Sequence, residues 1–142
     1  MMLLLTSCGN IAAASGSTIT ASGSTCTYSG PKQVPTNLSI TWDVKDTTPS
    51  MDYTFLIVTL SEGKTTADIN QFMGVKDAFL NVRTVPERSW MNEIEFTTLI
   101  PKTTSETIDL STNGVYHGEP LYVICLSHTA AFAVVGPIEV QQ

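Results

Sequence analysis

Polar and apolar residues alternate in several stretches of the chain after residue 36. In 37–44 (NLSITWDV) an apolar side chain occupies every second position, which is typical of a strand with one buried face. The segments 90–100, 105–111 and 131–140 are also predicted strands, and Gly136–Pro137 interrupts the last of them. The alternation in 90–100 places Ile94, Phe96, Thr98 and Ile100 on one common face.

Two other segments are nearly continuous runs of apolar and β-branched residues. They are 52–60 (DYTFLIVTL) and 121–128 (LYVICLSH), and such runs are typical of strands covered on both faces. The segment 77–85 is a further predicted strand that ends before Pro86.

One short helix is predicted in 65–74 (TTADINQFMG). Thr65 is a suitable N-cap, Asp68 falls in the first turn, and Gly74 marks the end. Strands separated by turns predict an all-β fold rather than alternating strands and helices. We expect an antiparallel β-sandwich of about seven strands, with an extended N-terminal β arm and the helix in a crossover loop.

The opening of the chain differs from the rest in composition. Residues 1–31 contain no charged residue, and 14–27 repeat one seven-residue phrase, ASGSTIT and then ASGSTCT. The β-compatible triplets in this repeat, Thr18-Ile19-Thr20 and 25–27, predict two short strands joined by a glycine bend. We therefore divide the chain into an arm, 1–34, and a sandwich domain, 35–142. A flexible linker or a glycosylated stalk are the alternatives for the arm.

The first residues, MMLLLTSC, contain a sequence similar to the lipobox of bacterial lipoproteins. In that interpretation Cys8 would carry the lipid and the protein would sit on the bacterial envelope. The apolar stretch 2–5 is shorter than the 7–15 residues usual in a signal peptide, and no basic residue precedes it. No run approaches 18 apolar residues, so no membrane span is predicted.

Charge narrows the possible partners. The net charge is −6 and no Lys/Arg-rich stretch occurs, so we expect no nucleic-acid partner bound through a basic patch. Charged residues make up only 14% of the chain, well below the quarter or so usual in soluble domains. This low fraction favours a surface that is partly covered, by a protein partner, a surface receptor or further copies of the chain.

The three cysteines, Cys8, Cys26 and Cys125, allow one internal disulfide. In an oxidising compartment the predicted pair is Cys26 with Cys125, because both fall in strand-like sequence. In a reducing compartment all three would be small buried apolar side chains. The spacing contains no CxxC pair, so no zinc site is expected.

No combination of residues predicts catalysis or a cofactor. His117 lies in loop sequence near Glu119, whereas His128 follows Ser127, and neighbours on a strand point to opposite faces. That geometry disfavours a Ser–His pair.

The acidic residues have ordinary interpretations. Asp43, Asp46 and Asp52 surround one turn, but they lack the EF-hand spacing and its glycine, so solvated carboxylates are favoured over calcium ligands. Glu93 and Glu95 alternate on the expected outward face of their strand. No metal site is predicted.

The two tryptophans have different interpretations. Trp42 lies on the apolar face of its strand and is a predicted core residue. Trp90 and Met91 border a strand after a long connection, and such aromatic residues are enriched at interfaces. We predict an interface that uses Trp90 and Met91, together with the arm residues Thr18, Ile19 and Thr20.

Several positions resemble the immunoglobulin-like and fibronectin type III sandwiches. They are Trp42, Tyr53 at the start of the next strand, and Leu110 followed six residues later by Tyr116. The resemblance implies that 121–126 and 133–140 are the last two strands. It departs from the family because 61–100 is long, the corner lacks proline, and 1–34 has no counterpart. A viral jelly roll or the protruding domain of a virus coat protein is similar to a comparable degree.

Two functional hypotheses follow. The first is a non-catalytic structural or interaction protein, a self-associating subunit of a surface assembly such as a virus capsid or virion surface. The alternative is a secreted or lipid-anchored, adhesin-like module that recognises a ligand through 61–76 and 84–92. We expect a homo-oligomer on the first hypothesis, a location at the virion or extracellular surface, and no enzymatic activity.

Overall fold

The computed structural model describes residues 16–46, 52–76, 78–79, 89–99, 102–128 and 130–142. Within these ranges the chain forms nine strands and one helix. Their bounds are β1 (Ser17–Ser22), β2 (Thr25–Ser29), β3 (Gln33–Val34), β4 (Asn37–Val44), β5 (Tyr53–Leu60), α1 (Thr66–Asn70), β6 (Met91–Leu99), β7 (Thr104–Asp109), β8 (Leu121–Ser127) and β9 (Ala130–Val140).

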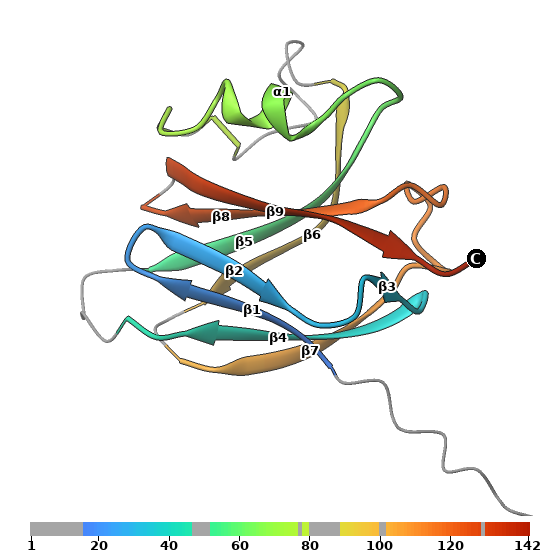
Figure 1. Ribbon diagram of the computed structural model, residues 1–142, viewed down its shortest axis with the longest axis horizontal. Coiled ribbons are helices and arrows are strands. Elements are labelled where there is room, and N and C mark those ends of the chain that lie inside the picture. The colour runs from blue at the N-terminus through green and yellow to red at the C-terminus, as the bar shows by residue number, and fades with distance from the viewer. Residues whose placement is uncertain (1–15, 47–51, 77, 80–88, 100–101, 129) are drawn as a thin grey trace, which may run out of the picture.

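The strands form two sheets that pack face to face (Figure 1). The strand order is β2-β1-β4-β7 in the four-stranded sheet and β3-β9-β8-β5-β6 in the five-stranded sheet. The predicted all-β sandwich is therefore confirmed. Both sheets are mixed rather than purely antiparallel, because β1 pairs in parallel with β4 and β3 pairs in parallel with β9.

Local sequence patterns predicted most of these strands. The predicted strand 37–44 is β4 without a change of boundary, and 52–60 and 121–128 correspond to β5 and β8. The predicted strand 77–85 differs: Ala78 and Phe79 lie in a turn, and the remainder of that segment lies outside the described residues. Its apolar pattern reflects burial, because both Ala78 and Phe79 are buried.

Residues 17–34, in which Lys32 is the one charged residue, belong to the sandwich, and this corrects the predicted separate arm. Strand β1 lies between β2 and β4, and its Ile19 and Ala21 are fully buried in the core of the same chain. Gly23 supplies the left-handed turn of the β1–β2 hairpin, with a φ of 57°. Burial excludes an ionised side chain at Ile19 and Ala21, because a charge there would be desolvated. Residues 1–15 lie outside the described residues.

The core between the sheets is built on stacked aromatic side chains. The rings of Trp42 and Phe55 stack with centroids 4.7 Å apart, which confirms the predicted core position of Trp42. The indole Nε1 of Trp42 donates a hydrogen bond to Glu106 Oε1 at 2.7 Å. The same oxygen accepts from Thr97 Oγ1 at 2.9 Å. Glu106 thus links β4 and β7 of one sheet to β6 of the other.

A disulfide joins Cys26 of β2 to Cys125 of β8, with their Cα atoms 6.5 Å apart. This is the pair expected from the sequence for an oxidising compartment. Cys125 is fully buried and Cys26 packs against the same core. The bond therefore ties the edge of one sheet to an inner strand of the other across the sandwich.

A second core lies on the outer face of the five-stranded sheet. Successive residues of β5 alternate between the two cores: Phe55 and Ile57 face the sandwich interior, whereas Leu56 and Val58 face outward. The segment after β5, which includes α1, covers these outward side chains and buries Ile69 among them (Figure 1). The near-continuous apolar sequence of β5 is explained by burial on both faces.

Helix α1 is short but well capped. Thr65 Oγ1 accepts a hydrogen bond from the Ala67 N–H at 3.2 Å, and Asp68 Oδ2 accepts one from the Thr65 N–H at 2.9 Å. This reciprocal capping box satisfies two of the N–H groups that a helix start leaves unpaired.

A β-bulge in β6 changes which residues face the core. Ile57 pairs with Glu95 and Val58 pairs with Glu93, so no residue of β5 pairs with Ile94. The alternation predicted for 90–100 is therefore interrupted at this point. Ile94 is buried, but Phe96 is 41% exposed, which corrects the prediction that Phe96 shares a face with Ile94.

Candidate functional site

The 61–76 connection borders two hollows on the described surface. We call the first the polar cleft; its volume is about 460 Å³, and it is lined by Leu60, Ser61, Glu62, Gly63, Lys64, Asn92, Glu119, Pro120 and Tyr122. We call the second the apolar groove; its volume is about 400 Å³, and it is lined by Gly23, Ser24, Gly74, Ser127, Ala130, Ala131 and Phe132. A smaller hollow of about 200 Å³ lies beside the starts of β1 and β4.

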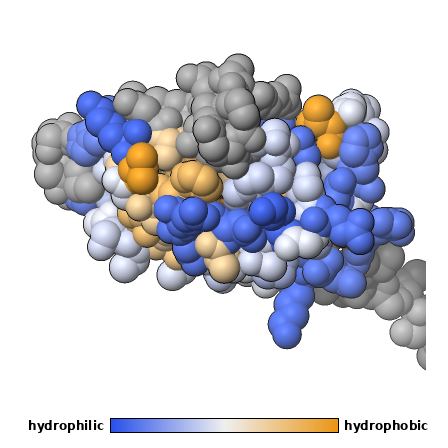
Figure 2. Space-filling model, turned by 90° about the horizontal axis from the view of Figure 1, so that it is seen from above, coloured by the Kyte–Doolittle hydropathy of each residue, from blue (hydrophilic) through white to orange (hydrophobic). Residues whose placement is uncertain are grey.

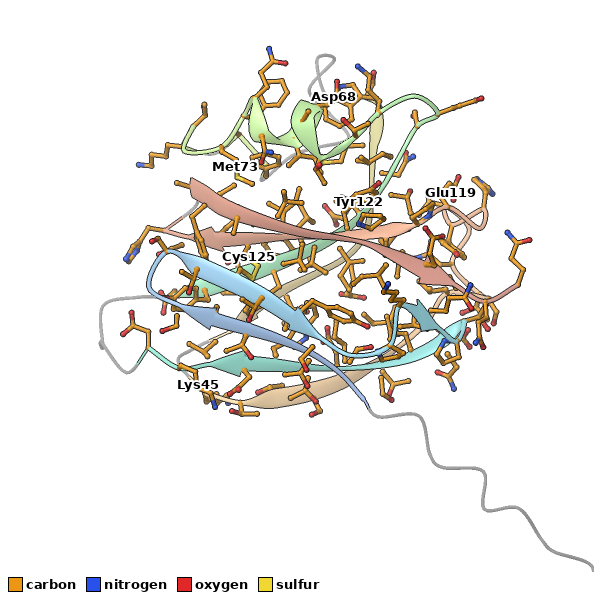
Figure 3. All side chains as sticks on the ribbon, viewed as in Figure 1. Lys45, Asp68, Met73, Glu119, Tyr122 and Cys125 are labelled. Carbon is orange, nitrogen blue, oxygen red and sulfur yellow. A yellow bond between two sulfur atoms is a disulfide. The ribbon has the colours of Figure 1, made fainter. Side chains whose placement is uncertain are left out.

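Three parts of the chain build the polar cleft: the end of β5 with the turn after it, Asn92 of β6, and the start of β8. A tight turn follows β5, in which Gly63 has a φ of 81° and the Lys64 N–H donates to the Ser61 carbonyl at 3.1 Å. The other wall is the start of β8, where Glu119 directly precedes Pro120 and Tyr122 points to the outer face of the sheet. Figure 3 labels Glu119 and Tyr122 at this end of the molecule.

The cleft contains charges of both signs. Lys64 Nζ lies 3.2 Å from Asp68 Oδ1 and 5.2 Å from the centroid of the Trp90 ring. These two contacts hold the ammonium group at the rim through an ion pair and a cation–π interaction. Glu119 Oε2 accepts a hydrogen bond from the His117 N–H at 2.8 Å. This bond orients the Glu119 carboxylate and does not use its second oxygen.

Several polar side chains of the cleft make no side-chain hydrogen bond within the described parts of the chain. They are Ser61, Glu62, Asn92 and Tyr122. Burial and, to a smaller extent, the charge of Glu139 raise the pKa of the Tyr122 phenol above its usual value. The hydroxyl group therefore keeps its proton at neutral pH and remains a hydrogen-bond donor.

The apolar groove lies at the opposite end of the 61–76 connection. Its floor includes Phe132, whose ring meets Tyr53 edge to face with centroids 5.9 Å apart. Val75, next to the lining residue Gly74, is 51% exposed. Figure 2 shows apolar surface gathered toward the left of this face, with hydrophilic surface beside it. Ser127 Oγ is buried here and has no hydrogen-bond partner among the described residues.

The histidines and aspartates that the sequence analysis weighed for catalysis or metal binding do not form a common site in the described parts of the chain. His117 and His128 are both exposed, and His128 occupies the β8–β9 turn with a left-handed φ of 50°. Asp43 forms an ion pair with Lys45 at 2.8 Å, and Asp46 accepts from Tyr53 Oη at 3.3 Å. No group of three or more His, Cys, Asp or Glu suited to a metal ion occurs within the described ranges.

The predicted interface residues have mixed positions. Ile19 and Met91 are buried in the two cores of their own chain, so neither is available to a partner, which corrects both predictions. Thr18, Thr20 and Trp90 are half-buried. Trp90 packs against Phe72, with ring centroids 6.4 Å apart, at the edge of the outer core. Of the predicted loop 84–92, residues 84–88 lie outside the described residues.

The sequence did not identify the polar cleft as a whole. It singled out 61–76 as a recognition loop, and Glu62 and Lys64 fall within that range. Asn92, Glu119 and Tyr122 carry no motif, and nothing in their spacing places them beside residue 62. Only the pairing of β8 with β5, and of β5 with β6, brings the walls together.

Within the described residues, no helix has both the length and the apolar character needed to cross a membrane. No protein-family model matches the chain, and the search of curated proteins found no match.

Proposed function

We propose that this chain is a non-catalytic binding module that works in an oxidising compartment and holds its ligand against the 61–76 connection. The observation that carries this proposal is the position of that connection. It covers the outer face of the five-stranded sheet and borders both the polar cleft and the apolar groove. Loops fixed on a rigid scaffold are the usual location of binding residues.

The disulfide supports the proposal that the protein works in an oxidising compartment. Cys26–Cys125 closes a separation of 99 residues, and structural disulfides persist mainly in secreted, periplasmic and surface-exposed proteins. An extracellular or envelope location is therefore proposed. Attachment through a lipid on Cys8 is the version of this proposal that the lipobox-like sequence supports.

The strand order supports an immunoglobulin-like classification of the sandwich. With β4 and β7 as strands B and E, and β9, β8, β5 and β6 as strands G, F, C and C′, the five-stranded sheet contains the order G-F-C-C′ of a variable-type domain. The four-stranded sheet contains the adjacent strands B and E, but it has no counterpart of strand D among the described residues, and β1 and β2 extend it beyond strand B. In that scheme the 61–76 connection is an enlarged C–C′ loop. This classification describes architecture and carries no function by itself.

The proposal is tested by ligand screening with the full-length, ¹⁵N-labelled protein. Neutral oligosaccharides, short peptides, spermidine and inorganic phosphate are titrated while amide chemical shifts are recorded. We expect at least one class to shift amides of residues 61–64, 92 and 119–122, or of 74 and 127–132. If no class shifts either group at millimolar concentration, the binding module is rejected.

Self-association is the second candidate function, and the exposed Val75 beside the apolar groove favours it. A subunit of a surface assembly, such as a capsid or virion surface, would bury this patch against another copy. We expect sedimentation velocity to detect oligomers at high protein concentration, and Val75→Asp to abolish them because it would place a carboxylate in the contact. A monomer at all concentrations rejects this candidate.

A further inference from the structure

We propose that the polar cleft binds a neutral saccharide. This inference rests on the proposed function, because it specifies the class of ligand held at one end of the 61–76 connection. The cleft, at about 460 Å³, falls within the range of roughly 300–1,000 Å³ found for small-molecule sites. Its lining and its charges restrict the ligand class in three steps.

The first step concerns hydrogen bonding. Glu62, Asn92 and Tyr122 line the cleft, and their polar side chains have no side-chain hydrogen-bond partner in the described parts of the chain. Together they offer a carboxylate that only accepts, an amide that donates and accepts, and a phenol that donates and accepts. A saccharide hydroxyl also donates and accepts, so a polyhydroxylated ligand matches every member of this set. A lipophilic ligand would leave these groups unpaired at a free-energy cost.

The second step concerns charge. An anionic ligand would meet the carboxylates of Glu62 and Glu119. Since Lys64 is already paired with Asp68 at 3.2 Å, it does not offset both carboxylates for an incoming anion. The cleft therefore repels an anion, whereas a cation, which offers only hydrogen-bond donors, would leave the donor groups of Asn92 and Tyr122 without an acceptor.

The third step concerns the aromatic and apolar surface. Tyr122 is half-buried on the outer face of β8, and Leu60 and Pro120 line the same cleft. An aromatic body with a polar tip packs against the C–H face of a sugar ring while its hydroxyl group bonds at the edge. Gly63, at a φ of 81°, keeps the turn of the opposite wall free of a side chain.

The experiment uses the full-length, ¹⁵N-labelled protein with four probes: cellohexaose, mannohexaose, spermidine and inorganic phosphate. We expect at least one hexasaccharide to shift the amides of residues 61–64, 92 and 119–122, with a dissociation constant near 1 mM, while the charged probes leave them unchanged. Tyr122→Phe and Glu62→Ala should each raise that constant about three- to tenfold, because each removes one hydrogen-bonding group. Glu95→Ala, which removes a carboxylate outside the cleft, should leave it unchanged.

The outcomes separate this inference from the proposed function. Shifts at the cleft with spermidine or phosphate, and none with either hexasaccharide, overturn the saccharide inference and leave the binding module standing. Binding of a peptide at residues 74 and 127–132, with no saccharide-induced shift at the cleft, also overturns the saccharide inference and leaves the binding module standing. A hexasaccharide constant that Tyr122→Phe and Glu62→Ala both leave unchanged also overturns it. No shift at the cleft or the groove with any ligand class rejects both proposals.

Discussion

The carboxylate of Glu106 provides a direct test of how the two sheets are held together. Its Oε1 accepts hydrogen bonds from Trp42 Nε1 at 2.7 Å and from Thr97 Oγ1 at 2.9 Å. The Trp42 side chain is fully buried and Glu106 is half-buried, so the indole N–H has poor access to water as a replacement acceptor. The variant Glu106→Ala would leave the indole N–H unsatisfied, which costs about 1–3 kcal/mol. It would also remove the link between β7 and β6.

We expect Glu106→Ala to lower the free energy of unfolding by about 2–3 kcal/mol, since hydrogen bonds to charged groups contribute about 1.5–3 kcal/mol. With a slope of about 1–3 kcal/mol per molar urea, the unfolding midpoint should fall by roughly 1 M. Glu106→Gln keeps an acceptor oxygen in place and should cost less than half as much.

The measurement is urea unfolding at pH 7, followed by circular dichroism for each variant and for Glu62→Ala. Glu62 is exposed and carries no hydrogen bond among the described residues, so its loss should change stability by about 0.5 kcal/mol or less. If Glu106→Ala is as mild as Glu62→Ala, or if Glu106→Gln is as costly as Glu106→Ala, the proposed role of the shared acceptor is wrong.

Three further predictions concern stability. Replacing both Cys26 and Cys125 with alanine should lower the free energy of unfolding by about 4 kcal/mol, because the bond closes a loop of 99 residues; a loss below about 1 kcal/mol in urea would contradict this. A hydrogen bond from Lys45 and, to a smaller extent, one from Thr103 lower the pKa of Asp43 below its usual value of 3.8. The Asp43 carboxylate therefore stabilises the folded protein above pH 3.8, and this stabilisation is lost as the pH falls through the pKa of the folded state. Asp43→Asn should therefore flatten the urea midpoint between pH 5 and pH 2, and coincident profiles would rule this out. Thr65→Ala removes the N-cap acceptor of α1 and should weaken amide-exchange protection in the 61–76 connection by about 1 kcal/mol, whereas unchanged protection would show that the cap is dispensable.

Local sequence patterns predicted the strands well but not their partners. The period-two pattern of 37–44 defined β4, and the β-branched triplet around Ile19 indicated β1. The parallel pairing of these two strands joins residues 17–21 with 40–44, and no local pattern encodes such a contact. The composition of 1–31 suggested a separate arm because a buried strand of small residues and an exposed uncharged tether have similar composition.

The bulge in β6 is a second case in which local reasoning fails. One extra residue at Ile94 moves Phe96 off the face that it was expected to share with Ile94 and into an exposed position. A strict period of two cannot anticipate this change, because the inserted residue alters the facing of everything after it. The disulfide pair, in contrast, was predictable because only one pairing joined two strand-like segments.

The two cores explain how the proposed binding site can lie at the end of this sandwich without lowering the stability of the fold. Residues of β5 and β8 bury alternate side chains in the inner and outer cores, so the outer cover is fixed by its own apolar contacts, including those of Ile69. The polar side chains of the cleft stand at the rim of that cover and make few bonds to the protein. Substitution of these side chains should therefore change the free energy of unfolding only slightly. A ligand that pairs with them would gain the hydrogen bonds that the fold leaves unused.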